Sequence, residues 1–350
     1  MLATKLATQG YAAKSAGTRL EPFQFDRREP GPHDVLIAIQ YCGICHTDIH
    51  QVRNEWGTSV YPMVPGHEIV GSVVRVGEKV SRFKPGDTVG VGCFVDSCRT
   101  CPACKAGEEQ FCEKGMVATY NSKDAEGNTT YGGYSSQIVV DENYVLKVSS
   151  KLPLERIAPL LCAGITTYSP LKRFGAGRGK KVAVAGLGGL GHMAVKLAAA
   201  MGSEVTVLSS TPSKKADAKT LGAHAFALTG EPKSLEPLWG RFDMVLDTVS
   251  AKHDLDLYLT LLRPDATLAL VGAAPQAVEF RPHNLILGRK RVAGSLIGGI
   301  KETQEMLDFC AERNIGADVE VIPMKKVEEA YERALKSDVR YRFVINMKTL

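Results

Sequence analysis

The first 150 residues alternate short apolar runs with turn-forming residues. The runs over 35–39, 69–76 and 87–91 are rich in Val and Ile, which favours β-strands. Between two of them, the Lys84-Pro85-Gly86-Asp87 segment is a turn signal. Short strands separated by tight turns predict a small, mainly β domain, a barrel or a sandwich, in this part of the chain.

The pattern changes near residue 155, where apolar strands begin to alternate with helical segments. Residues 181–185 read as a buried strand, and 190–201 as a helix rich in Ala, Val and Leu. Further strands are expected over 204–208, 244–247, 267–271 and, last in the series, 292–297. Strands alternating with helices predict an α/β domain with a doubly wound parallel sheet.

The C-terminal residues contain two helical patterns and a final apolar run. Met306, Leu307, Phe309 and Cys310 are the apolar residues of a helix expected over 302–313. A second helix is expected over 327–336 and a strand over 341–345. We expect this segment to return to the first domain, so the predicted division of the chain is residues 1–153, 154–295 and 296–350.

Length and charge narrow the class of protein. A chain of 350 residues exceeds one ordinary core, which favours two domains. The net charge of +5 is spread along the chain and its basic clusters are short, so no nucleic-acid interface is expected. No apolar stretch reaches about 18 residues, the length of a membrane span, and the N-terminus has no continuous apolar signal region. We expect a cytoplasmic protein, with a transit peptide as the alternative for the acid-poor N-terminus.

Four cysteines, Cys98, Cys101, Cys104 and Cys112, form a C-x2-C-x2-C-x7-C run. Zinc favours thiolates, and four of them complete its tetrahedral shell. The run therefore predicts a structural zinc site with no open position, rather than four core cysteines. The total of nine cysteines is odd, which also argues against a disulfide framework. Nearby Cys93 is expected to be a bystander.

A second group of candidate ligands is spread along the chain and consists of Cys42, Cys45, His67, Glu68 and Cys162. A catalytic zinc needs three protein ligands and one open position for water or substrate. Two thiolates and the His67 imidazole would supply the three, and Glu68 would be a fourth or alternating ligand. Spacing alone does not choose between Cys42 and Cys45.

A glycine-rich turn follows the apolar strand over 181–185. It reads Gly186-Leu187-Gly188-Gly189-Leu190-Gly191, a G-x-G-x-x-G pattern that also opens a helix. The first glycine permits a tight turn, the second lets a pyrophosphate approach the backbone, and the third allows the helix to pack on the strand. Since the helix N-terminus faces the phosphates, this segment predicts a dinucleotide site.

The residues that distinguish NAD from NADP lie at the end of the next strand, where an NAD-binding site carries Asp or Glu. This chain instead reads Ser209-Ser210-Thr211-Pro212-Ser213-Lys214-Lys215. Hydroxyls and lysines without a carboxylate suit a 2′-phosphate. The prediction is therefore NADP(H).

Together these residues resemble the zinc-containing medium-chain dehydrogenase/reductase superfamily, most closely its cinnamyl-alcohol-dehydrogenase-like branch and the NADPH-dependent aldehyde reductases of bacteria. The matching stretches are 41–48, 61–68, 159–166, 186–192 and 338–343. The resemblance implies a Rossmann domain beside a GroES-like, mainly β catalytic domain. It also implies two zinc ions per chain, one catalytic and one structural, and a homodimer joined through the last strand of the Rossmann sheet.

The resemblance assigns roles to the second ligand group. Cys45, which precedes the x-[Ser/Thr]-Asp stretch, matches the catalytic cysteine of the family, and Cys42 becomes structural. His67 and Cys162 match the other two ligands, and Glu68 matches the glutamate beside them.

The resemblance also places Thr47 and His50 on the proton relay of the family. The positions that bind the 2′-phosphate in NADPH-using members fall on Ser209, Ser210, Thr211 and Lys214. A one-residue difference in this loop leaves the choice between Lys214 and Lys215 open.

The implied reaction is the reversible reduction of aldehydes to primary alcohols. Plant members carry a tryptophan where this chain has Ala118 and often a phenylalanine where it has Leu296, whereas Trp56 can supply a substitute wall. We therefore expect a permissive pocket for aromatic and medium-chain aliphatic aldehydes. The alternatives are NAD-dependent oxidation of simple primary alcohols, a zinc-ribbon binding module and a zinc-free quinone reductase. The serine–lysine loop argues against the first, and the second ligand group argues against the other two.

Overall fold

The computed structural model describes residues 5–274 and 276–350, which form two compact units. Unit 1 runs to Cys162 and resumes with Gly298–Leu350, and unit 2 is Ala163–Ile297. The sequence suggested boundaries after residues 153 and 295, and residues 1–4 of its first predicted domain lie outside the described residues. Unit 1 extends to Cys162 because the short helix α3 (Leu154–Ile157) packs on three strands of its sheet, β3 (Asp34–Gly43), β4 (Ile69–Val76) and β16 (Val319–Pro323).

Unit 1 is built mainly of short strands. Its strands are β1 (Lys5–Ala12), β2 (Glu21–Arg28), β3 (Asp34–Gly43), β4 (Ile69–Val76), β5 (Thr88–Val91), β6 (Phe94–Asp96), β7 (Val117–Ala118), β8 (Gln137–Asp141), β9 (Leu146–Lys147), β16 (Val319–Pro323) and β17 (Arg342–Asn346). Its other helices are α1 (His46–Val52), α2 (Pro102–Lys105), α10 (Ile300–Glu312) and α11 (Val327–Leu335). The mainly β domain predicted for this part of the chain is confirmed.

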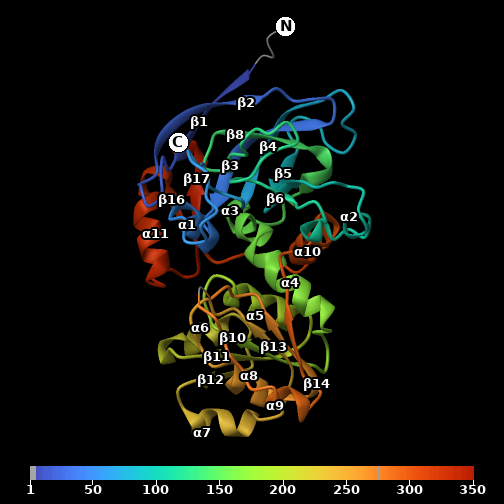
Figure 1. Ribbon diagram of the computed structural model, residues 1–350, viewed down its shortest axis with the longest axis vertical. Helices are drawn as coiled ribbons and strands as arrows, with labels where there is room; N and C mark the ends of the chain where they lie inside the picture. Colours follow the sequence, from blue (N-terminus) through green and yellow to red (C-terminus); the bar gives the residue numbers. More distant parts are fainter. Residues whose placement is uncertain (1–4, 275) are drawn as a thin grey trace. The chain divides into compact units, whose positions relative to one another are not determined.

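The main sheet of unit 1 pairs strands from the C-terminal segment with strands from the first half of the chain. Its order is β16-β17-β3-β4-β5-β9, and β8 also pairs with β3. Strand β17 lies beside β3 (Figure 1). The two strands run antiparallel, with Val344 opposite Gly43 and Ile345 opposite Cys42. The C-terminal segment therefore packs directly against the strand that leads into helix α1.

Unit 2 is an α/β unit with a parallel sheet. Its strands are β10 (Lys181–Ala185), β11 (Glu204–Ser209), β12 (Ala225–Leu228), β13 (Phe242–Asp247), β14 (Leu262–Leu270) and β15 (Arg291–Gly294). Its helices are α4 (Ala163–Arg173), α5 (Gly191–Ala200), α6 (Lys215–Thr220), α7 (Pro232–Leu235), α8 (Leu255–Leu261) and α9 (His283–Ile286). All strand pairs are parallel, in the order β12-β11-β10-β13-β14-β15. This is the 3-2-1-4-5-6 order of the Rossmann fold, and the predicted fold class is confirmed.

Some of the predicted elements and bounds need correction. Strands β12 and β16 were not anticipated, because both are short segments with a mixed exposure pattern. The last strand of the parallel sheet, expected over 292–297, ends at Gly294 instead. The chain leaves the extended conformation there, and Ile297 has a φ of 36°.

No helix in the described part of the chain is both long enough and apolar enough to cross a membrane.

Candidate active site

Helix α1 begins directly after Cys45, and its first turn organises the candidate zinc site. The backbone N–H of Cys45 donates to Oδ2 of Asp48 over 2.9 Å, the arrangement of a capping box. Asp48 is completely buried. Thr47 and His50 are three positions apart on this helix, so their side chains share one face.

The structure brings together Cys45, His67, Glu68 and Cys162, all of them buried in unit 1. One donor atom of each lies within 4.8 Å of the other three. The Sγ atoms of Cys45 and Cys162 are 3.9 Å apart. Two sulfur ligands at about 2.3 Å from a tetrahedral zinc would be about 3.8 Å apart. The donor types and their spacing therefore fit zinc, and Cys42 is not part of this group.

The two thiols are electrostatically coupled. The neighbouring Cys162 thiol and the His67 ring lower the pKa of Cys45 well below its ordinary value, against the effect of burial. The pKa of Cys162 is raised, because Cys45 and Cys93 lie beside it and the site is buried. Two thiolates at this distance repel each other in a low-dielectric site, and a bound dication would remove that repulsion.

A buried carboxylate orients the imidazole of this group. Nδ1 of His67 lies 3.1 Å from Oδ1 of Asp48. The same carboxylate also accepts hydrogen bonds from the Gly66 N–H at 3.2 Å and the Tyr134 hydroxyl at 3.4 Å. Since Asp48 takes the Nδ1 hydrogen, Nε2 is left as the nitrogen that can bind a metal, a frequent outer-shell arrangement in zinc sites.

The fourth candidate ligand has a counterion from the C-terminal segment. Oε1 of Glu68 accepts a hydrogen bond from the Arg342 guanidinium of β17, and both side chains are almost fully buried. Arg342 also donates to the Ile44 carbonyl at 2.8 Å. Oε2 of Glu68 has no hydrogen-bond partner among the described residues. Burial raises the pKa of Glu68, and the Arg342 charge opposes that shift. One oxygen is thus held by Arg342 while the other is unsatisfied.

The predicted proton-relay residue His50 has an acidic partner. Nδ1 of His50 lies 2.5 Å from Oε2 of Glu55, whose side chain is 41% exposed. The His50 ring is also 5.1 Å from the Trp56 ring. Thr47 is half-buried on the same helix face. This arrangement gives His50 a carboxylate through which a proton can pass to solvent.

The four-cysteine run forms a separate group, in which Cys98, Cys101, Cys104 and Cys112 each place a sulfur within 4.8 Å of the others. Cys101 caps helix α2, and the Sγ atoms of Cys98 and Cys104 are 3.9 Å apart. The backbone N–H groups of Thr100 and Cys101 lower the pKa of Cys98 to about 6. The spacing again matches a tetrahedral zinc, and all four positions of its shell would be filled by protein.

The glycine-rich turn of unit 2 lies between β10 and α5. Gly186 has a φ of 86°, and a Cβ at Gly191 would lie 2.2 Å from the Gly186 carbonyl oxygen. Leu187 is buried, Gly188 is exposed, and Gly189 and Leu190 are half-buried. The turn therefore offers exposed backbone at a helix N-terminus in a parallel sheet, where phosphates bind.

The loop after β11 places its polar residues next to that turn. Ser209 is buried and its Oγ accepts from the Thr211 N–H at 3.1 Å, whereas Ser210 is exposed. Nζ of Lys214 donates to the Leu187 carbonyl over 2.9 Å. The exposed Lys215 begins helix α6 instead.

Two family models match successive stretches of the chain. Residues 31–150 match the alcohol dehydrogenase GroES-like domain, and residues 189–312 match the zinc-binding dehydrogenase family. The chain belongs to the zinc-binding alcohol dehydrogenases.

Relatives within this family are similar over the full length of the chain. NADP-dependent alcohol dehydrogenase C 1 of Mycolicibacterium smegmatis is 56% identical, over 97% of this chain and 98% of its own. Aldehyde reductase YahK of Escherichia coli is 54% identical over 97% of both chains. The structure of the cinnamyl alcohol dehydrogenase of Helicobacter pylori complexed with NADP(H) is 47% identical, with a TM-score of 0.93 and 99% of both chains covered.

Sequence reasoning missed three residues of this zinc-binding dehydrogenase. Asp48 and Arg342 lie in the stretches that carried the family resemblance, but neither was given a role. Glu55 had no signal beyond its distance of five residues from His50. Their functions depend on contacts within the folded unit, with His67, Glu68 and His50 respectively.

Proposed function

We propose that this chain reduces aldehydes to primary alcohols with NADPH, in a reversible reaction that depends on a zinc ion held by Cys45, His67 and Cys162. The observation that carries the proposal is the contact between Arg342 and Glu68. Arg342 holds one oxygen of that carboxylate, so Cys45, His67 and Cys162 serve as the three protein ligands, and the fourth position is shared between substrate and the free oxygen of Glu68 as an alternating ligand. The four-cysteine group, by contrast, has no open position and serves as the structural site.

The bound groups would supply the difficult chemistry. A zinc ion held by Cys45, His67 and Cys162 would act as a Lewis acid on a carbonyl oxygen, and a reduced dinucleotide bound at the glycine-rich turn would supply the hydride. The protein residues then have three tasks. Asp48 holds the His67 ring in one orientation, and the cysteines together with His67 shape a buried site from which water is largely excluded.

Proton delivery is the second task, and it falls to helix α1. Thr47 is the residue that donates a proton to the product oxygen, and His50 resupplies it. His50 is suited to this exchange because its ring hydrogen-bonds the half-exposed Glu55 carboxylate. The face of α1 that carries Thr47 and His50 thus connects the buried site with solvent.

Cofactor selection is the third task. The end of β11 carries Ser209, Ser210 and Thr211 without a carboxylate, and Lys214 lies beside the glycine-rich turn. A 2′-phosphate would meet hydroxyl groups and a cation there, whereas the two ribose hydroxyls of NAD would lack their usual carboxylate. NADP-dependent members named among the relatives support the same choice.

The substrate range is proposed to be wide. Ala118 and Leu296 occupy positions where plant members carry aromatic walls. Trp56, 43% exposed and next to His50, supplies one aromatic surface close to the relay. This favours both aromatic and medium-chain aliphatic aldehydes, in line with the broad naming of the relatives as alcohol dehydrogenases and aldehyde reductases.

The assembly and the compartment are also proposals. Strand β15 is one of the two outer strands of the parallel sheet, and Ile286 and Leu287, which precede it in the chain, are each 73% exposed. A homodimer joined along this edge would bury both side chains. Light scattering of the purified protein measures the mass of the assembly and so tests this oligomeric state. The reduced cysteines of the two metal groups favour a cytoplasmic location.

The proposal is tested by initial rates with NADPH and NADH, each with cinnamaldehyde and with hexanal. Fast oxidation of NADPH with both aldehydes and slow oxidation of NADH is the expected result. Preference for NADH would move the function to the alternative, oxidation of simple primary alcohols. The variant Cys162→Ser serves as the control, since it removes one ligand of the open site and leaves the four-cysteine group intact.

A further inference from the structure

Strand β13 of unit 2 ends at Asp247, a buried carboxylate that the proposed mechanism does not use. Its Oδ1 accepts from the Val249 N–H at 3.0 Å, and its Oδ2 lies 2.7 Å from Nε2 of His253. The backbone oxygen of Asp247 accepts from the N–H groups of Val271 and Gly272 at 3.0 and 3.1 Å. One residue thus connects the loop after β13 with the loop after β14.

The His253 ring is fixed on both sides. Its Nδ1 lies 2.7 Å from the Ala251 carbonyl, which can only accept, so this nitrogen carries a hydrogen. Its Nε2 faces the Asp247 carboxylate, and the ring packs on Tyr258 of α8 at 5.3 Å. Burial raises the pKa of Asp247, and the hydrogen bonds from Val249 and His253 oppose that shift. The contact between His253 and Asp247 therefore holds the 248–253 loop in one conformation.

That loop is seated directly on the glycine-rich turn. The Thr248 hydroxyl donates to the Ala185 carbonyl at 2.8 Å, and a Cβ at Gly186 would lie 2.9 Å from the same hydroxyl oxygen. On the other side, a Cβ at Gly272 would lie 2.3 Å from the Val249 carbonyl oxygen. The three loops are in backbone contact, so a shift of the 248–253 loop would displace the turn that binds phosphate.

We infer that His253 and Asp247 are positioning residues for the dinucleotide: they hold Thr248 and Val249 against the glycine-rich turn and thereby set the affinity for NADP(H). The inference rests on the proposed function, since it concerns the same cofactor. Neither residue is expected to touch the reacting atoms. Their effect should appear in cofactor binding and not in turnover at saturating cofactor.

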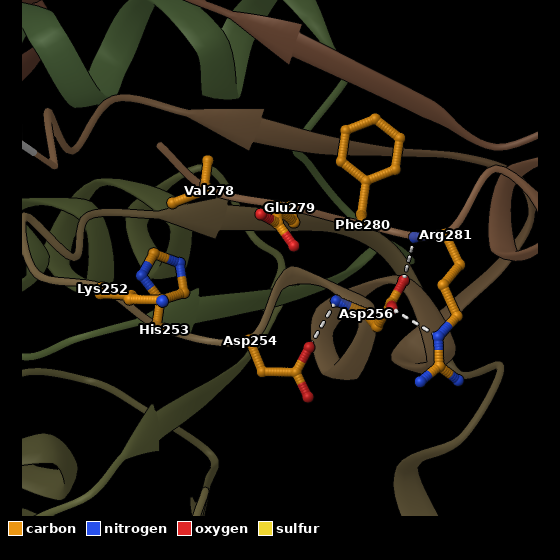
Figure 2. Close-up of a pocket in the computed structure, with 8 residues that line it drawn as sticks. All are labelled: Lys252, His253, Asp254, Asp256, Val278, Glu279, Phe280 and Arg281. Atoms are coloured by element: carbon orange, nitrogen blue, oxygen red, sulfur yellow. Dashed lines mark hydrogen bonds and ion pairs between the residues drawn. The ribbon is translucent and has the colours of Figure 1, made fainter. Parts of the chain in front are cut away.

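His253 is also open to a small molecule from outside. It lines a pocket of about 510 Å³ in unit 2, together with Lys252, Val278, Glu279 and Phe280 among others (Figure 2). An imidazole molecule would fit in this pocket beside Asp247 if the His253 side chain were removed. Rescue of a truncated variant by added imidazole is therefore a direct readout of the His253–Asp247 contact.

The test measures the Kd of NADPH by fluorescence titration of the full-length, zinc-loaded protein and of three variants. His253→Ala is expected to raise this Kd about tenfold, within the usual range for coupling through a positioned loop. Free imidazole should restore most of the lost affinity, and His253→Gln should lie between the two. Lys252→Ala, which alters the neighbouring residue in the same pocket, should bind NADPH like the wild type.

Measurements of turnover and of zinc content complete the test. With saturating NADPH, kcat and the KM for hexanal in His253→Ala should stay within about twofold of the wild type, as should its zinc content. Equal Kd values in all proteins would overturn the inference, as would a loss that imidazole leaves unchanged. A wild-type protein that binds no NADPH would instead overturn the proposed function on which the inference rests.

Discussion

Lys214 donates a hydrogen bond from its ammonium group to the backbone carbonyl of Leu187, across 2.9 Å and between two loops of unit 2. This contact brings a positive charge to the edge of the glycine-rich turn. Lys215, one residue later, is the first residue of α6 and is exposed. The contact distinguishes two lysines that the sequence left equivalent, and it favours Lys214 as the partner of a 2′-phosphate.

Replacement of Lys214 should therefore weaken the use of NADPH selectively. Lys214→Ala is expected to raise the KM for NADPH about tenfold or more, the factor for a lost charge-assisted contact of about 1.4 kcal/mol, with little change for NADH. Lys215→Ala is the matched control and should change neither value by more than about twofold. The opposite ranking of the two variants would assign the phosphate to Lys215.

The Asp48 carboxylate should control how tightly zinc is held in the open site. Asp48→Asn leaves His67 without its charged partner, and we expect a loss of about 10- to 100-fold in affinity for that zinc. Competition with a chromogenic chelator measures it. Tyr134→Phe removes the longer hydrogen bond of 3.4 Å to Asp48, together with the acceptor of the Tyr331 hydroxyl, but leaves the Asp48–His67 contact in place, so its effect on zinc affinity should be much smaller. Equal zinc affinity in both variants would contradict this role.

The two zinc sites should be separable by single cysteine substitutions. Cys104→Ser should reduce the zinc content from two to about one per chain and lower the Tm, because the metal links the chain around α2. Cys162→Ser should also leave about one zinc but abolish turnover. Cys310→Ser, a buried cysteine outside both groups, should retain two ions. Atomic emission and calorimetry provide the measurements, and one zinc in the unaltered protein would refute the assignment.

Proton delivery should depend on His50 and, more weakly, on Glu55. His50→Ala is expected to lower kcat for aldehyde reduction by about 10²-fold, at the lower end of the usual contribution of a proton-transfer group. Glu55→Gln keeps a hydrogen-bonding group but not the charge, so its loss should be smaller. Glu332→Gln, which alters the partner of Arg53 next to α1, is the control. Unchanged kcat and solvent isotope effect in His50→Ala would exclude it from the relay.

Stability at acidic pH should depend on Asp34 at the start of β3. Burial raises the pKa of Asp34, but the hydrogen bonds and charge of Arg28 and the Gly31 N–H outweigh it, so the net pKa is below the ordinary value of 3.8. A lowered carboxyl pKa stabilises the fold above the unfolded-state value, and that stability is lost as the pH falls through the folded-state value. The difference in Tm between wild type and Asp34→Asn should therefore be largest near neutral pH and shrink below about pH 4. A difference independent of pH would show that the charge of Asp34 is not involved.

Local pattern in the sequence was sufficient for much of the fold and for the donor residues. Strand β10 begins and ends where the apolar run over 181–185 does, since a buried parallel strand has a continuous apolar sequence. The cysteines, His67 and the glycines were recognisable because their chemistry depends on residue type and spacing. The long-range contacts could not be predicted from the sequence. Asp48 meets His67, and Arg342 meets Glu68, only after the sheet of unit 1 has assembled.

The return of β17 to β3 has a consequence for biosynthesis. Glu68 and Arg342 are 274 residues apart in the chain. At a translation rate of about 5–20 residues per second, the nascent Glu68 would wait roughly 14 to 55 seconds for its counterion. Unit 2 is continuous in sequence and leaves the ribosome within that interval, so it can fold first. Glu68 then meets Arg342 only when synthesis is almost finished, which delays the mature metal site until the last strand has docked.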